Sequence, residues 1–425
     1  MRKVISAILV LMMIFGMSVL PAQALPNDED KTVKILAIGN SYSNNAVEYI
    51  SRIADSMGFK VSVTSLYDDG CSLERHVKSY RSNAREYEFY VDGANMSAPK
   101  KNTMLEAFER DDYDYITLQQ SSSGAPNFST YWTEQNPWLT DLYDIIKKHE
   151  PQAEVMIHQT WSFSELHATT GTQWSSIVYE NSLEMFKKIE NSYEKAADKL
   201  GIDKEKGIIP AGKAIQLAKD EYGYGDFYNE SGDCLNGALY KDNVNHLNER
   251  GKYIAACVWI EKIFGADCRK ATYYNRTLTK DGCEILRQIA HEAVTGEVQC
   301  VKENWRYLPE EDGIKLVHYM GEVPADGTIE IPVSVDGKTV KTVDDTAFKY
   351  IEGIKKVILP NQTIKYEKGA LDKIATVEDL RMQKGGDKEE GNNILLIIII
   401  SVAVLIVAAV LLLLKFAVLK KKKTE

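Results

Sequence analysis

The stretch Lys34–Ser43, with the sequence KILAIGNSYS, constrains the fold of this chain more than any other. Its first half, Lys34–Ile38, is a short apolar run of the kind that forms a buried parallel strand. Residues 39–41 interrupt the run, and apolar residues spaced for an amphipathic helix follow from about Ala46 to Met57. The pattern predicts a strand, a tight turn and a helix, which together begin an α/β unit.

Ser41 lies on the predicted turn. A serine between a strand and a helix exposes its hydroxyl at the carboxyl edge of the sheet, and the helix N-terminus favours developing negative charge there. Ser41 is therefore a candidate nucleophile. The alternative is that Ser41 only caps the helix or shapes the turn.

Predicted strands and helices alternate over the first three hundred residues, which indicates a parallel sheet covered by helices on both faces. A small hairpin is expected at 86–93. In such sheets functional groups gather at the carboxyl ends of the strands. Ser41, Gly70, the pair Gln119–Gln120 and Trp161 all fall at such ends. After Lys34–Ile38, the expected strands are 60–66, 115–118, 154–158 and 207–210, and the longer expected helices are 138–149, 177–200 and 247–264.

Both ends of the chain have the patterns of export and membrane insertion. Two basic residues, the apolar run Val4–Leu20 and small residues up to Ala24 predict a signal peptide over residues 1–24. The 21 residues Ile394–Leu414 are uncharged and almost wholly apolar, enough at ~1.5 Å each to cross a core of ~30 Å. Because the basic tail 415–425 follows directly, we expect a single-pass type I protein of the cell membrane whose larger part is extracellular.

The charge of the exported part excludes some partners. The chain has 51 basic and 61 acidic residues, of which seven basic residues and one acidic residue lie in the signal and the tail, so the rest carries −16. Such a surface does not favour nucleic acid or anionic lipid, whereas neutral sugars and esters fit it. The six cysteines could pair outside the cell, and their spacing does not select a pairing. Cys257, in an apolar helical run, is expected to be a core thiol.

The segment 323–377 differs in character from what precedes it. IEIP at 329–332 is echoed by VILP at 357–360, and VKTVDDTAF at 340–348 by IKYEKGAL at 364–371. A loose period in the twenties is typical of a solenoid whose coils stack on one another. We expect a small β-rich repeat segment, followed by a charged linker over 378–393.

Catalysis by Ser41 needs a base, and the loop 240–248, YKDNVNHLN, offers one. His246 could take the proton of Ser41 while Asp242 holds the imidazole. Acyl transfer also needs donors aimed at the tetrahedral oxyanion, for which the backbone N–H groups of Ser41 and Gly70 and the amide of Gln120 are candidates. The spacings of the cysteines do not suit a zinc site.

These residues resemble the four blocks of the SGNH (GDSL-type) hydrolases. The opening GNSYS at 39–43, the turn around Gly70, the segment LQQSS at 118–122 and the late Asp/His loop are most similar to a bacterial branch with a GNSxS opening, and a QTW segment at 159–161 agrees with it. The resemblance covers about Val33–Phe264 and implies hydrolysis of carbohydrate or lipid esters without a metal or cofactor. It also implies a flavodoxin-like three-layer α/β/α sandwich, which we expect in a domain over 31–300. The segment 323–377 resembles the BspA-type leucine-rich repeats of bacterial surface proteins.

This sequence differs from the family pattern at two points, and each leaves alternatives open. A glutamine stands where the superfamily has an asparagine, so either Gln119 or Gln120 could line the oxyanion hole. The family motif is Asp-x-x-His, whereas Asp242 lies four residues before His246 and Asn243 occupies the expected position. Either of the two could orient His246. Further histidines such as His158 are expected to be packed or solvated.

Two main functions are considered, beside a third, an acyl transferase that would use the same serine. The first is a membrane-anchored extracellular serine esterase that removes acetyl or other small acyl groups from carbohydrates through Ser41, His246 and Asp242. The second is a surface adhesin that keeps the fold and a sugar-binding cleft without turnover.

Overall fold

The computed structural model describes residues 31–96, 101–225, 238–241 and 244–383. The chain divides into two compact units, Met1–Val301 and Lys302–Glu425, which are described separately below. The predicted signal peptide and the predicted membrane segment lie outside the described residues, as does the basic tail. In the part of the chain that is described, no helix has the length and apolar character needed to cross a bilayer.

A seven-stranded sheet forms the centre of the first unit, in the order β4-β3-β2-β1-β5-β6-β7. From β2 to β7 every neighbouring pair is parallel, so the order is the flavodoxin-like one that the family resemblance implies. At one edge β3 and β4 pair antiparallel as the expected hairpin. The strands are β1 (Val33–Gly39), β2 (Val61–Tyr67), β3 (Glu88–Val91), β4 (Ala94–Asn95), β5 (Tyr115–Leu118), β6 (Glu154–His158) and β7 (Ile208–Ile209).

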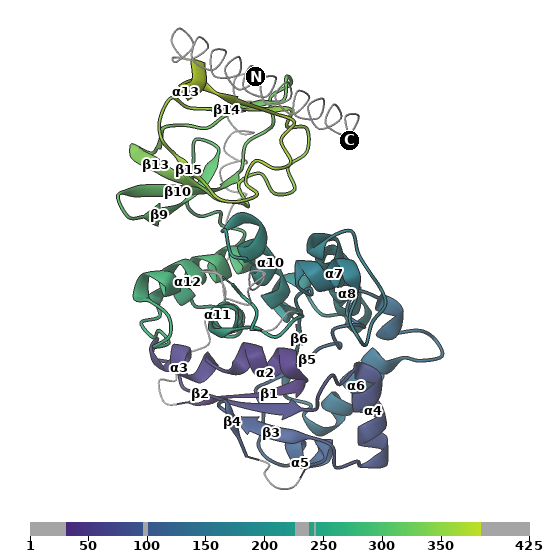
Figure 1. Ribbon diagram of the computed structural model, residues 1–425. Helices are drawn as coiled ribbons and strands as arrows, with labels where there is room; N and C mark the ends of the chain where they lie inside the picture. Colours follow the sequence, from purple (N-terminus) through teal and green to yellow (C-terminus); the bar gives the residue numbers. More distant parts are fainter. Residues whose placement is uncertain (1–30, 97–100, 226–237, 242–243, 384–425) are drawn as a thin grey trace, which may run out of the picture. The chain divides into compact units, whose positions relative to one another are not determined.

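Helices cover both faces of this sheet. On β1, Leu36 and Ile38 join a core formed with α4 (Leu73–Ser82), α5 (Met104–Phe108), α6 (Trp138–His149) and α8 (Ser182–Leu200). Ile35 and Ala37, which point the other way because side chains alternate along a strand, are equally buried. On that side α2 (Ser41–Val47), α3 (Ile50–Asp55), α10 (Ala211–Glu221) and α11 (Glu249–Phe264) pack together (Figure 1). The three-layer α/β/α prediction is confirmed.

Shorter helices occupy the connections. They are η1 (Phe128–Thr130), α7 (Glu165–Thr170), α9 (Lys204–Gly207) and η2 (Cys268–Lys270). The last helix of the unit, α12 (Lys280–Thr295), packs on α10 and α11. The five described cysteines, Cys71, Cys257, Cys268, Cys283 and Cys300, are all free thiols, and Cys257 is fully buried as expected.

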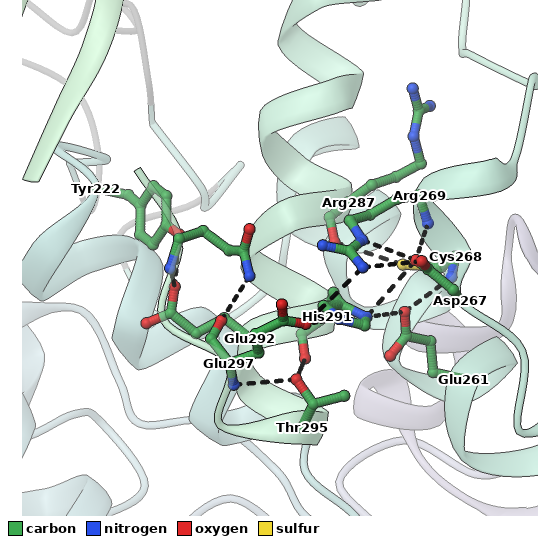
Figure 2. A network of polar contacts seen from close by, with 11 residues as sticks. Tyr222, Glu261, Asp267, Cys268, Arg269, Arg287, His291, Glu292, Thr295 and Glu297 are labelled. Atoms are coloured by element: carbon green, nitrogen blue, oxygen red, sulfur yellow. Dashed lines mark hydrogen bonds and ion pairs between the residues drawn. The ribbon is translucent and has the colours of Figure 1, made fainter. Parts of the chain in front are cut away.

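A polar network joins α11, η2 and α12 (Figure 2). His291 on α12 is buried, with Nδ1 2.9 Å from Glu261 and Nε2 2.9 Å from Glu297. Asp267 lies 3.6 Å from the same ring and is held by Arg269. Burial by itself lowers the pKa of His291, but the hydrogen bonds to Glu297 and Glu261 outweigh it and raise the pKa above its ordinary value. The His291 ring therefore bridges two carboxylates, most strongly when it is protonated, and its contact with Glu261 fastens α12 to α11.

Replacing His291 should destabilise the protein most at mildly acid pH. A raised folded-state pKa gives stability that is complete below the ordinary value of ~6.5 and is lost as the pH rises through the folded-state pKa. His291→Gln should cost about 1–3 kcal/mol at about pH 5.5 and less at about pH 9, measured by denaturant unfolding. His149→Gln is the control, since burial lowers the pKa of His149 and its removal should shift the pH dependence the opposite way. A loss for His291→Gln that is equal at both pH values would contradict the prediction.

The second unit is built from short strands around its own apolar core. One sheet has the order β12-β13-β10-β9-β8, with β15 also paired to β13, and the other is β11-β14-β16. The strands are β8 (Val301–Lys302), β9 (Trp305–Glu310), β10 (Gly313–Tyr319), β11 (Thr328–Glu330), β12 (Ser334–Val335), β13 (Lys338–Val343), β14 (Lys356–Leu359), β15 (Lys365–Tyr366) and β16 (Thr376–Asp379), and α13 (Leu380–Gln383) ends the described chain.

Two parallel ladders run through this unit. Thr328 lies opposite Lys356, which lies opposite Thr376. In the other ladder β10 pairs with β13 and β13 with β15. Strands that recur in parallel at this spacing agree with stacked coils, and the inward residues Ile329, Val357 and Leu359 belong to one core. The resemblance to BspA-type repeats itself stays a prediction.

Candidate active site at the carboxyl edge of the sheet

Ser41 is the first residue of α2 and is separated from the end of β1 by one residue, Asn40. The N-cap is Asn40, whose Oδ1 accepts a hydrogen bond of 3.0 Å from the N–H of Tyr42. The predicted start of the helix near Ala46 is therefore wrong: the Asn40 cap satisfies the first turn and lets the helix begin at Ser41. Ser41 is also not the cap that the alternative interpretation proposed. Among the described residues no hydrogen bond uses its hydroxyl, and the residue is half-buried.

Gly39 allows the close packing behind this turn. A Cβ at Gly39 would lie 2.3 Å from Ser43 Oγ and 3.0 Å from the side chain of Gln119. Ser43 Oγ itself donates a 2.6 Å hydrogen bond to Gln119 Oε1. Only glycine leaves room for this contact, so the GNS sequence reflects packing at the strand end as well as the turn.

The Gly70 turn lies against the Ser41 turn. Gly70 follows β2 with φ +59°, a conformation that glycine adopts without strain. Asn40 Nδ2 donates a 3.0 Å hydrogen bond to the carbonyl oxygen of the next residue, Cys71. The Asn40 side chain therefore holds together the two turns that carry the predicted nucleophile and the Gly70 oxyanion donor.

The two glutamines after β5 have separate surroundings. Gln119 Nε2 donates to Asn40 Oδ1 at 2.7 Å, which places Gln119 against the Ser41 turn. Gln120 Oε1 accepts from Leu73 N at 3.1 Å, and its Nε2 donates to the carbonyl and hydroxyl oxygens of Thr130 at 2.9 and 3.1 Å. In this arrangement Gln120 joins α4 to the loop before α6, and the N–H groups of its amide are already used in hydrogen bonds to Thr130. The predicted role of Gln120 as an oxyanion donor would require these bonds to rearrange.

The loop that carries His246 returns to α2 from two hundred residues downstream. Leu247 N donates to Asn45 Oδ1 at 2.8 Å, and Asn245 Nδ2 donates to the hydroxyl of Tyr42 at 3.1 Å. These contacts flank His246 on both sides, and they join its loop to the helix that begins with Ser41. The role of His246 as the base for Ser41 itself stays a prediction. Asp242 and Asn243 lie outside the described residues, so which of them orients His246 stays open.

The same loop is also fixed to the chain after β6. Trp161 Nε1 donates to Asn245 O at 2.7 Å, and Ser164 N donates to Val244 O at 2.7 Å. The Trp161 ring is buried and packs on Tyr42 with ring centroids 4.5 Å apart. Trp161 is therefore a core residue that supports the loop.

Sequence reasoning missed the polar residues that assemble the site, above all Asn40 and Asn45. Both are buried, and each accepts a hydrogen bond from a backbone N–H. A usable signal was present, since Ser41 and Asn45 are four residues apart and share one face of a helix. That signal was hidden because the helix was predicted to begin later.

Among the residues that the structure describes, two groups of side chains could hold a metal ion, and neither includes a predicted site residue. They are Glu261, Asp267 and His291 in the first unit, and Asp344, Asp345 and Glu367 in the second. His291 is paired with Glu261 and Glu297, and Lys315 is paired with Asp344 and Glu367. Both groups are explained by ion pairing.

Removing the Asn45 acceptor should loosen the His246 loop. Asn45→Ala leaves the N–H of the buried residue Leu247 without its partner, which should cost about 1–3 kcal/mol and speed hydrogen exchange at the Leu247 amide. Mass-spectrometric or NMR exchange measures this. Asn181→Ala is the control, because it removes a similar bond, from Glu184 N at the start of α8. Equal Leu247 exchange in both variants would contradict the prediction.

Comparison with known proteins places this architecture among characterised folds. One solved structure, a DUF4886 family protein from Bacteroides uniformis ATCC 8492, is 29% identical, with TM-score 0.53, over 62% of this chain and 95% of that one. An acetyl-xylooligosaccharide esterase from Geobacillus (10% identity, TM-score 0.34, 56% of this chain and 95% of that one) is similar at a lower level. A GDSL-like lipase from Bacteroides thetaiotaomicron VPI-5482 is also similar, with 8% identity and TM-score 0.30 over 54% of this chain and 86% of that one.

No curated protein matches the chain. The family described as "Domain of unknown function (DUF4886)" matches residues 34–293. That range begins within β1 and ends within α12, so it includes the main sheet, except Val33, and every described part of the candidate site. With more than half of its length matched, the chain belongs to the DUF4886 family.

Proposed function

We propose that this protein is a serine esterase of SGNH type that removes acetyl or other small acyl groups from carbohydrates. The observation that supports this most is the meeting of α2 and the His246 loop. The helix that begins with Ser41 accepts hydrogen bonds from residues on both sides of His246. The Ser41 turn, the Gly70 turn and the His246 loop thereby lie at one edge of a parallel sheet, where enzymes of this architecture have their sites.

The proposed reaction proceeds through an acyl-enzyme. Ser41 Oγ attacks the ester carbonyl carbon while His246 takes the hydroxyl proton, and the negative charge on the carbonyl oxygen is stabilised by the N–H groups of Ser41 and Gly70. The tetrahedral intermediate then expels the sugar alkoxide, which receives the proton from His246. Water, activated by the same imidazole, releases the acid and restores Ser41.

The proposal includes a location at the cell surface. The apolar segment Ile394–Leu414 and the basic tail after it would hold the catalytic unit outside the membrane. An enzyme anchored in this way suits a substrate that is itself attached to the cell surface. The −16 charge of the exported part favours neutral glycan esters over anionic ones.

Ser41→Ala should abolish ester hydrolysis. In a chain with an intact base and oxyanion site, loss of the nucleophile lowers kcat by on the order of 10⁴ or more. The measurement is release of p-nitrophenol from p-nitrophenyl acetate and of acetate from acetylated oligosaccharides by the 25–393 fragment. Ser51→Ala is the control, since Ser51 lies on the next helix and its hydroxyl contacts Asp92.

The outcomes of this experiment separate the two functions considered. Activity that survives in Ser41→Ala would remove Ser41 from the nucleophile role. A wild-type fragment that binds glycans and hydrolyses no ester would instead favour the adhesin function.

Two variants decide which residue orients His246. If Asp242 does so, Asp242→Asn should lower kcat by on the order of 10³ to 10⁴ while Asn243→Ala has little effect. If Asn243 does so, Asn243→Ala should lower kcat by a similar factor and Asp242→Asn should have little effect. His246→Gln should lower kcat in either case, and a fully active His246→Gln would contradict the base assignment.

A further inference from the structure

A chain of buried hydrogen bonds runs from β6 to the Ser41 turn. His158, the last residue of β6, has Nδ1 3.2 Å from Gln119 Oε1. Gln119 Nε2 donates to Asn40 Oδ1 at 2.7 Å, and Asn40 Nδ2 donates to Cys71 O at 3.0 Å. His158 and Gln119 are fully buried, and Asn40 is 1% exposed.

The partners fix the direction of every bond in this chain. Asn40 Oδ1 is the oxygen, because the N–H of Tyr42 points at it, so Nδ2 must face Cys71 O. Because Asn40 Oδ1 only accepts, Gln119 Nε2 must face it, which leaves Gln119 Oε1 to accept from Ser43 Oγ. Since Oε1 carries no hydrogen, the atom of His158 facing it must be a protonated Nδ1.

The remaining ring nitrogen of His158 supports this assignment. Nε2 is buried without a hydrogen-bond partner in the described part of the chain, as a neutral imidazole with its proton on Nδ1 allows. The ring makes edge contacts with Trp161 and Trp259, with centroid distances of 6.1 and 5.1 Å. Burial also lowers the pKa of His158 to about 3, so the ring is uncharged at neutral pH. His158 is thus a fixed donor of one bond.

We propose that Gln119 is a positioning residue for catalysis: oriented by His158, it holds Asn40 so that the Ser41 and Gly70 turns keep a fixed separation. Asn40 is the link between these turns, since it caps α2 with one atom and binds the carbonyl after Gly70 with the other. The spacing of the two N–H groups that would stabilise an oxyanion depends on this link. This inference rests on the proposed esterase function.

Removing the Gln119 amide should lower kcat and leave substrate binding nearly unchanged. Small displacements of catalytic groups cost up to about 100-fold in rate. Gln119→Met should therefore lower kcat about 10- to 100-fold, with KM within about twofold of the wild-type value. Gln216→Met is the control, because Gln216 is similarly buried but contacts Ser162 and Asp220 on α10. Its kcat and KM should match those of the wild type.

A double-mutant cycle tests whether Gln119 and Asn40 act through the same series of hydrogen bonds. Asn40→Asp keeps the acceptor for Tyr42 and Gln119 but replaces the donor toward Cys71 O. If both residues act through the same spacing, Gln119→Met should lower kcat much less in the Asn40→Asp background than in the wild type. Fully multiplicative effects would overturn the inference. Should Gln119→Met fail to fold, Gln119→Glu retains the shape and the acceptor for Ser43 and His158.

An NMR measurement tests the chain independently of activity. The His158 ring should be a neutral Nδ1-protonated tautomer that does not titrate between about pH 5 and about pH 8, and its Nδ1 signal should shift in Gln119→Met. If the wild type hydrolyses no ester but shows this tautomer, the proposed esterase function is wrong, and the chain of hydrogen bonds from His158 to Asn40 is still supported. If the wild type is active and Gln119→Met retains wild-type kcat, or if His158 titrates normally, the positioning role is wrong.

Discussion

The capping of α2 by Asn40 is the interaction on which the rest of the candidate site depends. After β1 the backbone changes from extended to helical within one residue, and the N–H groups of the first helical turn need acceptors. Asn40 Oδ1 serves Tyr42 N, while the other end of the same amide holds Cys71 O. One side chain therefore starts the helix and fixes a second loop. Aspartate could cap the helix equally well, but its carboxylate would have no donor for Cys71.

This arrangement requires polar side chains to be buried at the sheet edge, which is costly unless each is hydrogen-bonded. Asn40, Ser43 and Gln119 meet that requirement through one another. The apolar layers on both faces of β1 keep the strand ends in place, so the polar groups at those ends meet with little freedom. A fully satisfied network in a dry environment favours a single arrangement of its members.

Periodicity predicted the framework well because a buried parallel sheet depends on local patterns. The strands Tyr115–Leu118 and Glu154–His158 and the helix Trp138–His149 were predicted residue for residue. The helix beginning at Ser41 was not, because its first turn is polar and depends on a cap rather than on apolar spacing. The separate roles of Gln119 and Gln120 could not be predicted either. Those roles follow from partners such as Asn40 and Thr130, which only the folded chain brings near.

The candidate site could be predicted only in part, because the side chains that join its loops have partners far away in the sequence. The sequence motifs placed Ser41, Gly70 and His246 at loops of one sheet edge, and the structure brings the loops of Ser41 and His246 together. The side chains that join those loops, Asn45 and Tyr42, carry no motif. Their contacts with Leu247 and Asn245 span more than two hundred residues of sequence.

The edges of the main sheet affect how copies of this protein can associate at high concentration. Its outermost strands, β4 and β7, are two residues long. So short an edge gives a neighbouring chain too few free backbone groups to extend the sheet. Copies of this unit could therefore lie side by side at high concentration without joining edge to edge into fibrous aggregates.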